Sequence, residues 1–322
     1  MTAIPCVACG GAMRPWLDMP IDAKTFAATS FGRVSRCEHC GHGSAAPLPR
    51  PEDVPLFYAL EKYYTQGTSH IPYVTPRLHD RILTRLAWMC DEGVDLKRAL
   101  QALELRSHST VCEIGCGHAG YLALLKAEGH MTIGVDPDPK AVAQAIAIGI
   151  EVLPGTAEVL PEKIQCSRFD LVIMSHSLEH CIDPGLAVRN VRSILRPGGT
   201  FVCEVPNCGC THFQWNNICS EMFDAPRHLH FFNAASLHAS IESAGMTVRA
   251  VQYTGFTRHH SPGWRLTEQR IHDNLKRVVS RAPAKHTFWK SLLLLMATIG
   301  AAPSKKYDSV RIIATRPSTP SK

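Results

Sequence analysis

The chain has 322 residues, of which 45% are hydrophobic and 19% are charged, and it carries a formal net charge of +6 at pH 7. This length accommodates one large domain with an appendage and allows a sizeable core. Lysine and arginine are spread along the chain without a long basic run, so we expect no nucleic-acid partner. The N-terminus has no charged segment followed by an apolar stretch, and we therefore expect the thirteen cysteines to be reduced, in the cytoplasm.

The N-terminal segment carries two CxxC pairs, formed by Cys6, Cys9, Cys37 and Cys40. Each pair can turn two thiolates toward one metal ion, and four thiolates complete the closed tetrahedral site of structural zinc. We therefore predict a zinc ribbon over residues 1–46. His39 and His42 are expected to be its exposed neighbours.

Residues 47–106 are predicted to form a helical connector that begins in a proline-rich stretch. Aromatic residues at helical spacing follow over Phe57–Tyr64. Two interpretations are open here: Tyr63 and Tyr64 cover a cofactor pocket as a lid, or the segment is an ordinary packing helix. Apolar residues between Pro76 and Leu105 predict one or two amphipathic helices that pack on the sheet.

The central motif of the chain is VCEIGCGHAG, Val111–Gly120. An apolar run over Thr110–Ile114 predicts a buried strand, and a helical period follows over Tyr121–Glu128. The glycines between them allow positive φ and close approach of a ligand, while the helix N-terminus offers free N–H groups. This order predicts a cofactor cradle.

Two acidic residues stand beside the cradle. Glu113 precedes the first glycine by two residues, where a carboxylate could face a ligand's ammonium group or anchor the turn. A second strand over Met131–Val135 ends in Asp136, which is placed to accept ribose hydroxyls, as in dinucleotide-binding folds. The glycine motif alone fits a dinucleotide as well as S-adenosylmethionine.

The alternation of strands and helices continues through the chain. Glu151–Leu153 is a short third strand, and Phe169–Ser175 is a fourth strand that runs into the polar sequence SHSLEH. LRPGG, Leu195–Gly199, then stands directly before a fifth strand over Thr200–Val205. Ser175 and the following histidine therefore lie at the carboxyl end of a parallel strand, where ligands of such sheets bind.

The order of these motifs resembles that of the class I S-adenosylmethionine-dependent methyltransferases, over roughly Ser107–Thr254 plus a terminal strand. The resemblance implies a seven-stranded, mostly parallel α/β sheet of Rossmann-like type over residues 107–322, with an insertion at about 255–308. It also implies S-adenosylmethionine as the cofactor. The alternative is a nucleotide-binding domain of another kind.

By this resemblance, the cofactor-binding residues are Glu113, Gly115, Gly117, Gly120, Asp136, Ala157, Glu158, Ser175 and His176. In the family, the pair that maps onto Ala157 and Glu158 lies along the adenine. Glu158 could equally be a carboxylate in the first turn of a helix, which is a favourable position for a negative charge.

The long loop after the fifth strand carries the candidate base. His228 fits the HxxxF element of zinc-knuckle and related sugar methyltransferases, in some of which this histidine is the proposed base. His180, in the sequence LEHxxDP, is either a second catalytic residue or a structural loop residue; His176 and His230 are further alternatives for the base. The C-methylating relatives often have a tyrosine and a glutamate just before the first histidine, where Ala225 and Arg227 stand here, which argues against C-methylation.

The insertion at about 255–308 is basic and then apolar over Lys290–Pro303. This apolar run is too short to span a bilayer, which needs about 20 residues. Two interpretations remain: it rests on a membrane surface, or it is a helix buried against the domain or a partner. The resemblance implies that the last strand, Asp308–Arg316, runs antiparallel beside a sixth strand over Thr247–Thr254.

The resemblance predicts transfer of a methyl group from S-adenosylmethionine to a small molecule. Zinc-knuckle methyltransferases often act in sugar or polysaccharide pathways, so we expect a sugar or glycan hydroxyl as the acceptor. A lipid or quinone-like acceptor at the membrane surface is the alternative within enzymes. A protein that binds S-adenosylmethionine or a partner without catalysis is the alternative outside them.

Overall fold

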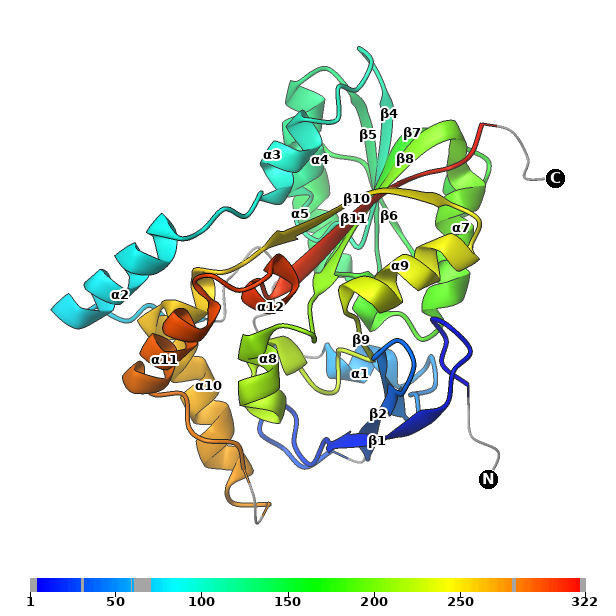
Figure 1. Cartoon of the computed structure of the whole chain (residues 1–322). Coiled ribbons are helices and arrows are strands. Elements are labelled where there is room, and N and C mark those ends of the chain that lie inside the picture. The colour runs from blue at the N-terminus through cyan, green and yellow to red at the C-terminus, as the bar shows by residue number, and fades with distance from the viewer. Residues whose placement is uncertain (1–4, 30–31, 59, 61–70, 280–281, 319–322) are drawn as a thin grey trace.

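The computed structural model describes residues 5–29, 32–58, 60, 71–279 and 282–318. Its main element is a seven-stranded sheet in the order β10-β11-β8-β7-β4-β5-β6 (Figure 1). The strands are β4 (Thr110–Ile114), β5 (Met131–Asp136), β6 (Val152–Pro154), β7 (Phe169–Ser175), β8 (Leu195–Pro206), β10 (Thr247–Thr254) and β11 (Ser309–Thr315). Strands β4 to β8 pair in parallel, and β11 enters antiparallel between β8 and β10. The predicted seven-stranded, mostly parallel architecture is confirmed.

Helices cover both faces of this sheet and close two apolar cores. The helices are α3 (Leu96–Gln101), α4 (Gly120–Ala127), α5 (Pro139–Ala147), α6 (Glu162–Gln165), α7 (Pro184–Ile194) and α9 (Ala234–Ser243). One core contains side chains of α7 and α9, such as Val188 and Leu237. The other contains side chains of α3 and α4, such as Leu100 and Leu122. The strands that carry the predicted site residues are therefore held from both sides.

A second, four-stranded sheet lies beside the first (Figure 1). Its strands are β1 (Met13–Asp18), β2 (Arg33–Cys37), β3 (Gly43–Ala46) and β9 (His230–Phe231). The strand β9 belongs to the long loop after β8 and pairs antiparallel with β3, through Ser44 and His230. The predicted ribbon thus shares a sheet with the loop that carries the candidate base.

The connector contains α1 (Val54–Phe57), α2 (Leu78–Met89) and α3. Tyr63 and Tyr64, the predicted lid residues, lie outside the described residues. Of the one or two helices predicted to pack on the sheet, α3 does so. Leu83 and Ala87 of α2 pack in a cluster with Leu295 of the insertion, which also touches Tyr253 at the end of the sheet.

The insertion supplies η5 (Arg258–His260), α10 (Pro262–Leu275), α11 (Phe288–Thr298) and α12 (Pro303–Lys306). The long loop after β8 adds α8 (Thr211–Asn216), η3 (Asn217–Cys219) and η4 (Glu221–Phe223). Helix α11 buries Leu294 and Leu295 but leaves Trp289 70% exposed and Met296 58% exposed. One face of this helix is therefore buried against the domain, as one interpretation predicted, and the other face is exposed. In the described part of the chain, no helix is long and apolar enough to cross a membrane.

A buried ion pair links β8 to β11 in the middle of the sheet. Arg311 is fully buried, and its Nε donates to Glu204 Oε2 at 2.7 Å. The same guanidinium donates to the carbonyl of Val94 and to the side chain of Gln252. The other oxygen of Glu204 lies 3.3 Å from His176 Nε2, so this carboxylate is shared between two cations.

We expect Arg311→Met to lower the free energy of unfolding by about 3 kcal/mol, because it leaves the buried Glu204 with one partner fewer. Urea denaturation would measure the loss. Arg249→Met is the matched control, because Arg249 is exposed and its Nε donates across the strand pair to Thr315. A change below about 0.5 kcal/mol in both variants would contradict this role for the ion pair.

Candidate active site

The predicted glycine turn joins β4 to α4. Gly115 and Gly117 have φ of 73° and 51°, and Ala119, the residue before α4, has φ of 57°. A Cβ on Gly115 would stand 2.4 Å from the Cβ of Ser177, which follows β7. The absence of a side chain at Gly115 therefore lets the loop after β7 approach the turn closely.

Glu113 and Asp136 are both buried beside this turn. The Oδ2 of Asp136 accepts the N–H of Gly117 at 2.8 Å, and its Oδ1 accepts the N–H of Asp138. Glu113 Oε2 is buried and has no hydrogen-bond partner among the described residues. Burial, with the nearby charge of Asp136, raises the pKa of Glu113 to about 8. An orphaned buried oxygen of this kind suits a ligand that brings a cation, such as the ammonium group of S-adenosylmethionine.

The predicted adenine pair has a structural task as well. Asn190 donates to the carbonyls of both Ala157 and Glu158. The carboxylate of Glu158 accepts the N–H of Ile182 at 2.8 Å, so it ties this bend to the loop after β7. Glu158 lies in a bend and precedes α6, so its alternative placement in the first turn of a helix is wrong.

His176 follows Ser175, the last residue of β7, and has a positive φ of 52°. Its Nδ1 is 3.5 Å from Glu179 and its Nε2 is 3.3 Å from Glu204. Burial alone would lower the pKa of His176, but the two carboxylates outweigh it and raise the pKa to about 9. A protonated imidazole that is held on both sides is a poor proton acceptor, so the geometry disfavours His176 as the base.

The two predicted catalytic histidines meet next to this group. The rings of His180 and His228 are edge-to-face with centroids 4.7 Å apart. Glu179 is fully buried, and its Oε1 lies 3.9 Å from His228 Nε2. One nitrogen or oxygen atom from each of these three residues lies within 4.8 Å of the others. Together these atoms could transfer a proton or bind a cation.

Backbone carbonyls orient both imidazoles. His228 Nδ1 is 2.9 Å from the carbonyl of Met222, and His180 Nδ1 is 3.0 Å from the carbonyl of Arg227. A carbonyl can only accept, so the contact with Met222 places the proton of His228 on Nδ1 and leaves the lone pair of Nε2 free in the neutral ring. The Tyr58 hydroxyl also lies 2.8 Å from His180 Nδ1, which brings the connector to the site.

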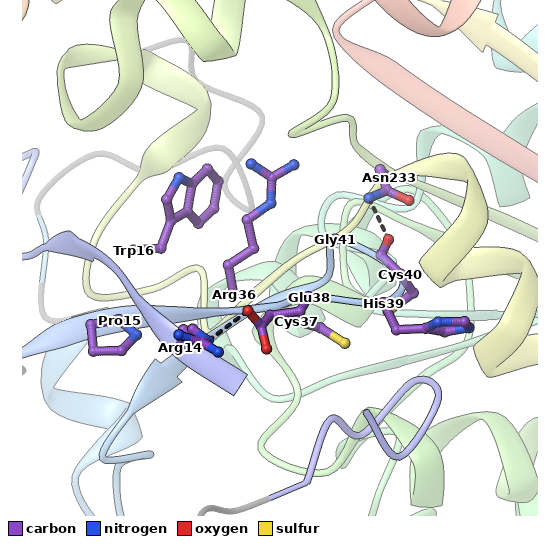
Figure 2. Close-up of a pocket in the computed structure, with 10 residues that line it drawn as sticks. All are labelled: Arg14, Pro15, Trp16, Arg36, Cys37, Glu38, His39, Cys40, Gly41 and Asn233. Atoms are coloured by element: carbon purple, nitrogen blue, oxygen red, sulfur yellow. Dashed lines mark hydrogen bonds and ion pairs between the residues drawn. The ribbon is translucent and has the colours of Figure 1, made fainter. Parts of the chain in front are cut away.

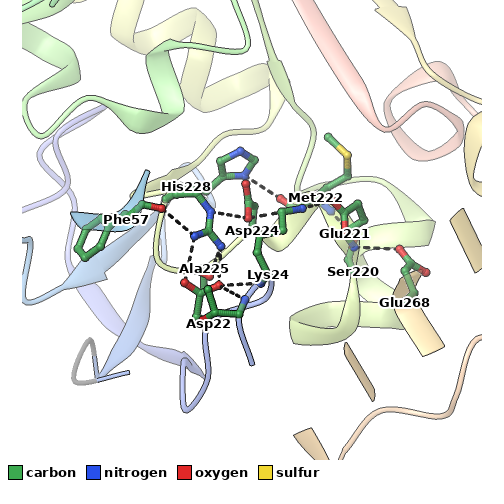
Figure 3. Close-up of polar contacts among 12 residues, drawn as sticks. Asp22, Lys24, Phe57, Ser220, Glu221, Met222, Asp224, Ala225, His228 and Glu268 are labelled. Atoms are coloured by element: carbon green, nitrogen blue, oxygen red, sulfur yellow. Dashed lines mark hydrogen bonds and ion pairs between the residues drawn. The ribbon is translucent and has the colours of Figure 1, made fainter. Parts of the chain in front are cut away.

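Sequence reasoning did not find the task of Arg227. This side chain is fully buried and donates to Asp22, Asp224 and the carbonyl of Phe57, at 2.7–3.1 Å (Figure 3). It therefore joins the N-terminal segment and the connector to the loop that holds His228. Asp22 lies 205 residues from Arg227 in the sequence, so no local pattern around Arg227 could predict this contact.

The four cysteines of the predicted ribbon lie together. Cys6 Sγ is 3.6 Å from Cys40 Sγ, Cys9 Sγ is 3.5 Å from Cys37 Sγ, and all four sulfurs lie within 4.8 Å of one another. Four ligands at about 2.3 Å from one zinc ion would stand about 3.8 Å apart, so these thiols could hold a metal. All thirteen cysteines are free.

The expectation for the neighbouring histidines is half wrong. His39 is exposed, but His42 is fully buried, and its Nε2 lies 3.1 Å from His230 Nδ1. The two rings stack with centroids 5.3 Å apart. Because β9 pairs with β3, His42 is covered by the loop after β8, which the local sequence could not indicate. His230 is thus part of the small sheet rather than a neighbour of His228 in the acid–base group.

A separate pocket of about 530 Å³ opens beside the cysteines (Figure 2). It is lined by Arg14, which pairs with Glu38, and by Arg36, whose guanidinium lies 4.7 Å from the centroid of Trp16. Neither the glycine turn nor His228 lines it, so it is distinct from the candidate active site.

The family model described as "Methyltransferase domain" matches residues 90–251, which is half of the chain. The chain belongs to this methyltransferase family. It is a class I S-adenosylmethionine-dependent methyltransferase, and both the predicted family and the predicted enzyme class are confirmed.

Curated relatives of this methyltransferase include the ubiquinone biosynthesis O-methyltransferases. That of Pseudomonas fluorescens (strain SBW25) is 28% identical over 198 residues, which cover 57% of this chain and 80% of the relative. That of Methylobacterium sp. (strain 4-46) is 29% identical, over 48% of this chain and 65% of the relative. The sugar-pathway similarity expected from the cysteine pairs has no support among these relatives.

Solved structures to which the chain is similar include two methyltransferases of low sequence identity. A possible histamine N-methyltransferase from Thermotoga maritima is 21% identical, with a TM-score of 0.47, over 73% of this chain and 91% of that chain. Phosphoethanolamine N-methyltransferase 2 of Haemonchus contortus is 16% identical, with a TM-score of 0.46, over 74% of this chain and 57% of that chain.

The raised pKa of Glu113 gives a prediction for Glu113→Gln. The pKa rises from about 4.5 to about 8 on folding, so the wild-type enzyme loses folding free energy as the pH rises through this range. The uncharged amide avoids that loss, so the melting temperature of the cofactor-free variant should fall less between pH 5 and pH 8. Its affinity for S-adenosylmethionine should nevertheless drop about tenfold or more, because the ammonium loses its carboxylate.

Thermal unfolding at several pH values and titration calorimetry measure the two effects. Glu151→Gln, on an exposed glutamate paired with Lys163, is the control. An unchanged pH dependence of the melting temperature together with unchanged affinity would contradict the assignment of Glu113.

Proposed function

We propose that this methyltransferase transfers the methyl group of S-adenosylmethionine to a hydroxyl of a quinone-like small molecule. The observation that carries the proposal is the convergence of His180, His228 and Glu179 beside the glycine turn. The relatives are O-methyltransferases of ubiquinone biosynthesis, which favours a quinone-like acceptor methylated on oxygen over the sugar hydroxyl.

Glu113, Asp136 and the glycine turn are proposed to bind the cofactor. Asp136 already accepts two backbone N–H groups, but a carboxylate has about four acceptor positions, so two remain for ribose hydroxyls. Glu113 faces the ammonium group, and Ala157 with Glu158 lies along the adenine. Ser175 and His176 line the same crevice at the carboxyl end of β7. The sulfonium of the bound cofactor supplies an electrophilic methyl carbon.

His228 is proposed to accept the hydroxyl proton. Its Nδ1–H is held by the Met222 carbonyl, which leaves the Nε2 lone pair available. Burial lowers the pKa of His228 to about 4, so the ring is neutral at neutral pH. Glu179, 3.9 Å from Nε2, favours the imidazolium that forms when the ring takes the proton. Such a weak base takes the proton as the new bond between the hydroxyl oxygen and the methyl carbon forms, because the hydroxyl becomes strongly acidic when its oxygen is methylated.

We expect His228→Ala to retain its affinity for S-adenosylmethionine and to lose at least about a hundredfold in turnover, the usual effect of removing a general base. Labelled cofactor with a panel of hydroxylated quinone-ring compounds and sugars measures turnover and acceptor class together. His238→Ala is the control, because His238 is exposed on α9. Turnover of sugars alone would contradict the acceptor proposal, and turnover within a few-fold of wild type in His228→Ala would contradict the base.

An exposed apolar face is proposed to bring the enzyme to a membrane that contains such an acceptor. Helices α2 and α11 lie side by side (Figure 1). Their exposed apolar side chains are Leu78, Ile82, Leu86, Trp88, Met89, Trp289, Leu293 and Met296. Arg81 and Arg85 are exposed on α2. Apolar side chains flanked by arginines suit the surface of an anionic bilayer.

We expect the wild-type enzyme to float with anionic liposomes and the double variant Trp289→Ser, Leu293→Ser to bind them about tenfold or more weakly, because two apolar side chains no longer leave water. The matched control is Ile146→Ser, Ile148→Ser, which removes two equally exposed apolar side chains at α5. Sedimentation of the wild-type enzyme without the liposomes would contradict the membrane proposal.

The cysteine cluster is proposed to hold one structural zinc ion through Cys6, Cys9, Cys37 and Cys40. Four sulfurs leave no open coordination position, so the metal would stabilise the ribbon without taking part in methyl transfer. Because β3 pairs with β9, loss of this metal is expected to disturb the loop that carries His228.

A further inference from the structure

Three buried side chains lie close together outside the candidate active site. His212 lies on α8, Glu268 on α10, and His286 directly before α11. One ligand atom of each lies within 4.8 Å of the other two. His212 Nε2 is 3.0 Å and 3.2 Å from the two oxygens of Glu268, and His286 Nδ1 is 2.5 Å from Oε2. Two imidazole nitrogens therefore converge on one carboxylate.

No lysine or arginine of the described residues forms an ion pair with the carboxylate of Glu268. The residue is fully buried, and burying a carboxylate is costly unless its charge is compensated. Among the described residues, its ion-pair partners are the two imidazoles alone. A divalent cation between these three side chains would supply the missing positive charge.

The surroundings of Glu268 and His286 resemble the outer shell of a metal site, whereas His212 Nδ1 is buried without a hydrogen-bond partner among the described residues. Glu268 Oε1 accepts from Trp264 Nε1 at 3.0 Å. It also accepts from the backbone N–H of Glu221 at 3.0 Å (Figure 3). His286 Nε2 lies 2.8 Å from Ser291 Oγ, on the side of the ring away from Glu268. Metal-binding carboxylates and imidazoles are usually oriented by such second hydrogen bonds.

We propose that His212, Glu268 and His286 bind a divalent transition-metal ion, for which zinc is the best match. Two imidazoles and one carboxylate form an established zinc ligand set. Zinc binds nitrogen and oxygen at about 2.0–2.2 Å, so tetrahedral ligand atoms stand about 3.3–3.5 Å apart, close to the spacing between His212 and Glu268. His286 would retreat by about 1 Å, and a water molecule would complete the coordination.

This metal would fix the segment that orients the candidate base. The carboxylate of Glu268 accepts a hydrogen bond from the N–H of Glu221. The carbonyl of the next residue, Met222, accepts from His228 Nδ1. The site also joins α8, α10 and α11, so it ties the insertion to the loop after β8. The proposal does not depend on the acceptor or on the role of His228.

Cobalt loading of metal-free, full-length protein tests the site. We expect two equivalents of Co²⁺ per chain: one with the thiolate charge-transfer bands of the cysteine cluster, and one without them. Glu268→Gln, which keeps the shape of the side chain but removes its charge, should lose the second equivalent and keep the thiolate bands. Glu242→Gln, the same change on an exposed glutamate of α9, should retain both.

Two results would overturn the proposal. The first is a wild-type protein in which all bound Co²⁺ shows thiolate charge-transfer bands. The second is a folded Glu268→Gln variant that still binds the Co²⁺ equivalent that lacks thiolate bands. If Glu268→Gln does not fold, the wild-type spectrum and stoichiometry still decide between a metal and plain hydrogen bonds.

Discussion

The buried carboxylate of Glu204 is the interaction on which the rest of the site depends. It lies on β8 between Arg311 of β11 and His176 after β7, so three strands of the sheet meet at one charge. Without these partners the carboxylate would be isolated in the interior, at a cost of several kcal/mol. The same contacts hold His176 in its left-handed conformation. They thereby fix the start of the loop that carries Glu179 and His180 beside the glycine turn.

A second set of buried charges connects the N-terminal part of the chain to the loop after β8. Arg227 binds Asp22 and the carbonyl of Phe57, while β9 adds the loop after β8 to the small sheet. His228 stands between these two connections and is oriented by the Met222 carbonyl. The cysteine ribbon, the connector and the methyltransferase sheet therefore position the candidate base together, although it belongs to only one of them.

Local sequence was sufficient to predict the elements whose contacts are local. The glycine turn and the strand ending in Asp136 follow from short motifs in a fixed order, whereas the antiparallel last strand was expected from the family resemblance. What local sequence could not indicate depends on contacts between distant segments. Burial of His42 requires β9, nearly 190 residues away, and the packing of α2 requires α11. The sugar acceptor was predicted by analogy with zinc-knuckle methyltransferases, and the cysteine pairs behind that analogy belong to the ribbon rather than to an acceptor-binding site.

A crystal structure with bound S-adenosylhomocysteine tests the central claim most directly, namely that the glycine turn and the histidine pair face one crevice. The account predicts the ligand's ammonium group at Glu113 and its ribose at Asp136. Its sulfur should point toward His180 and His228. A ligand bound elsewhere, or a sulfur turned away from both imidazoles, would contradict the account.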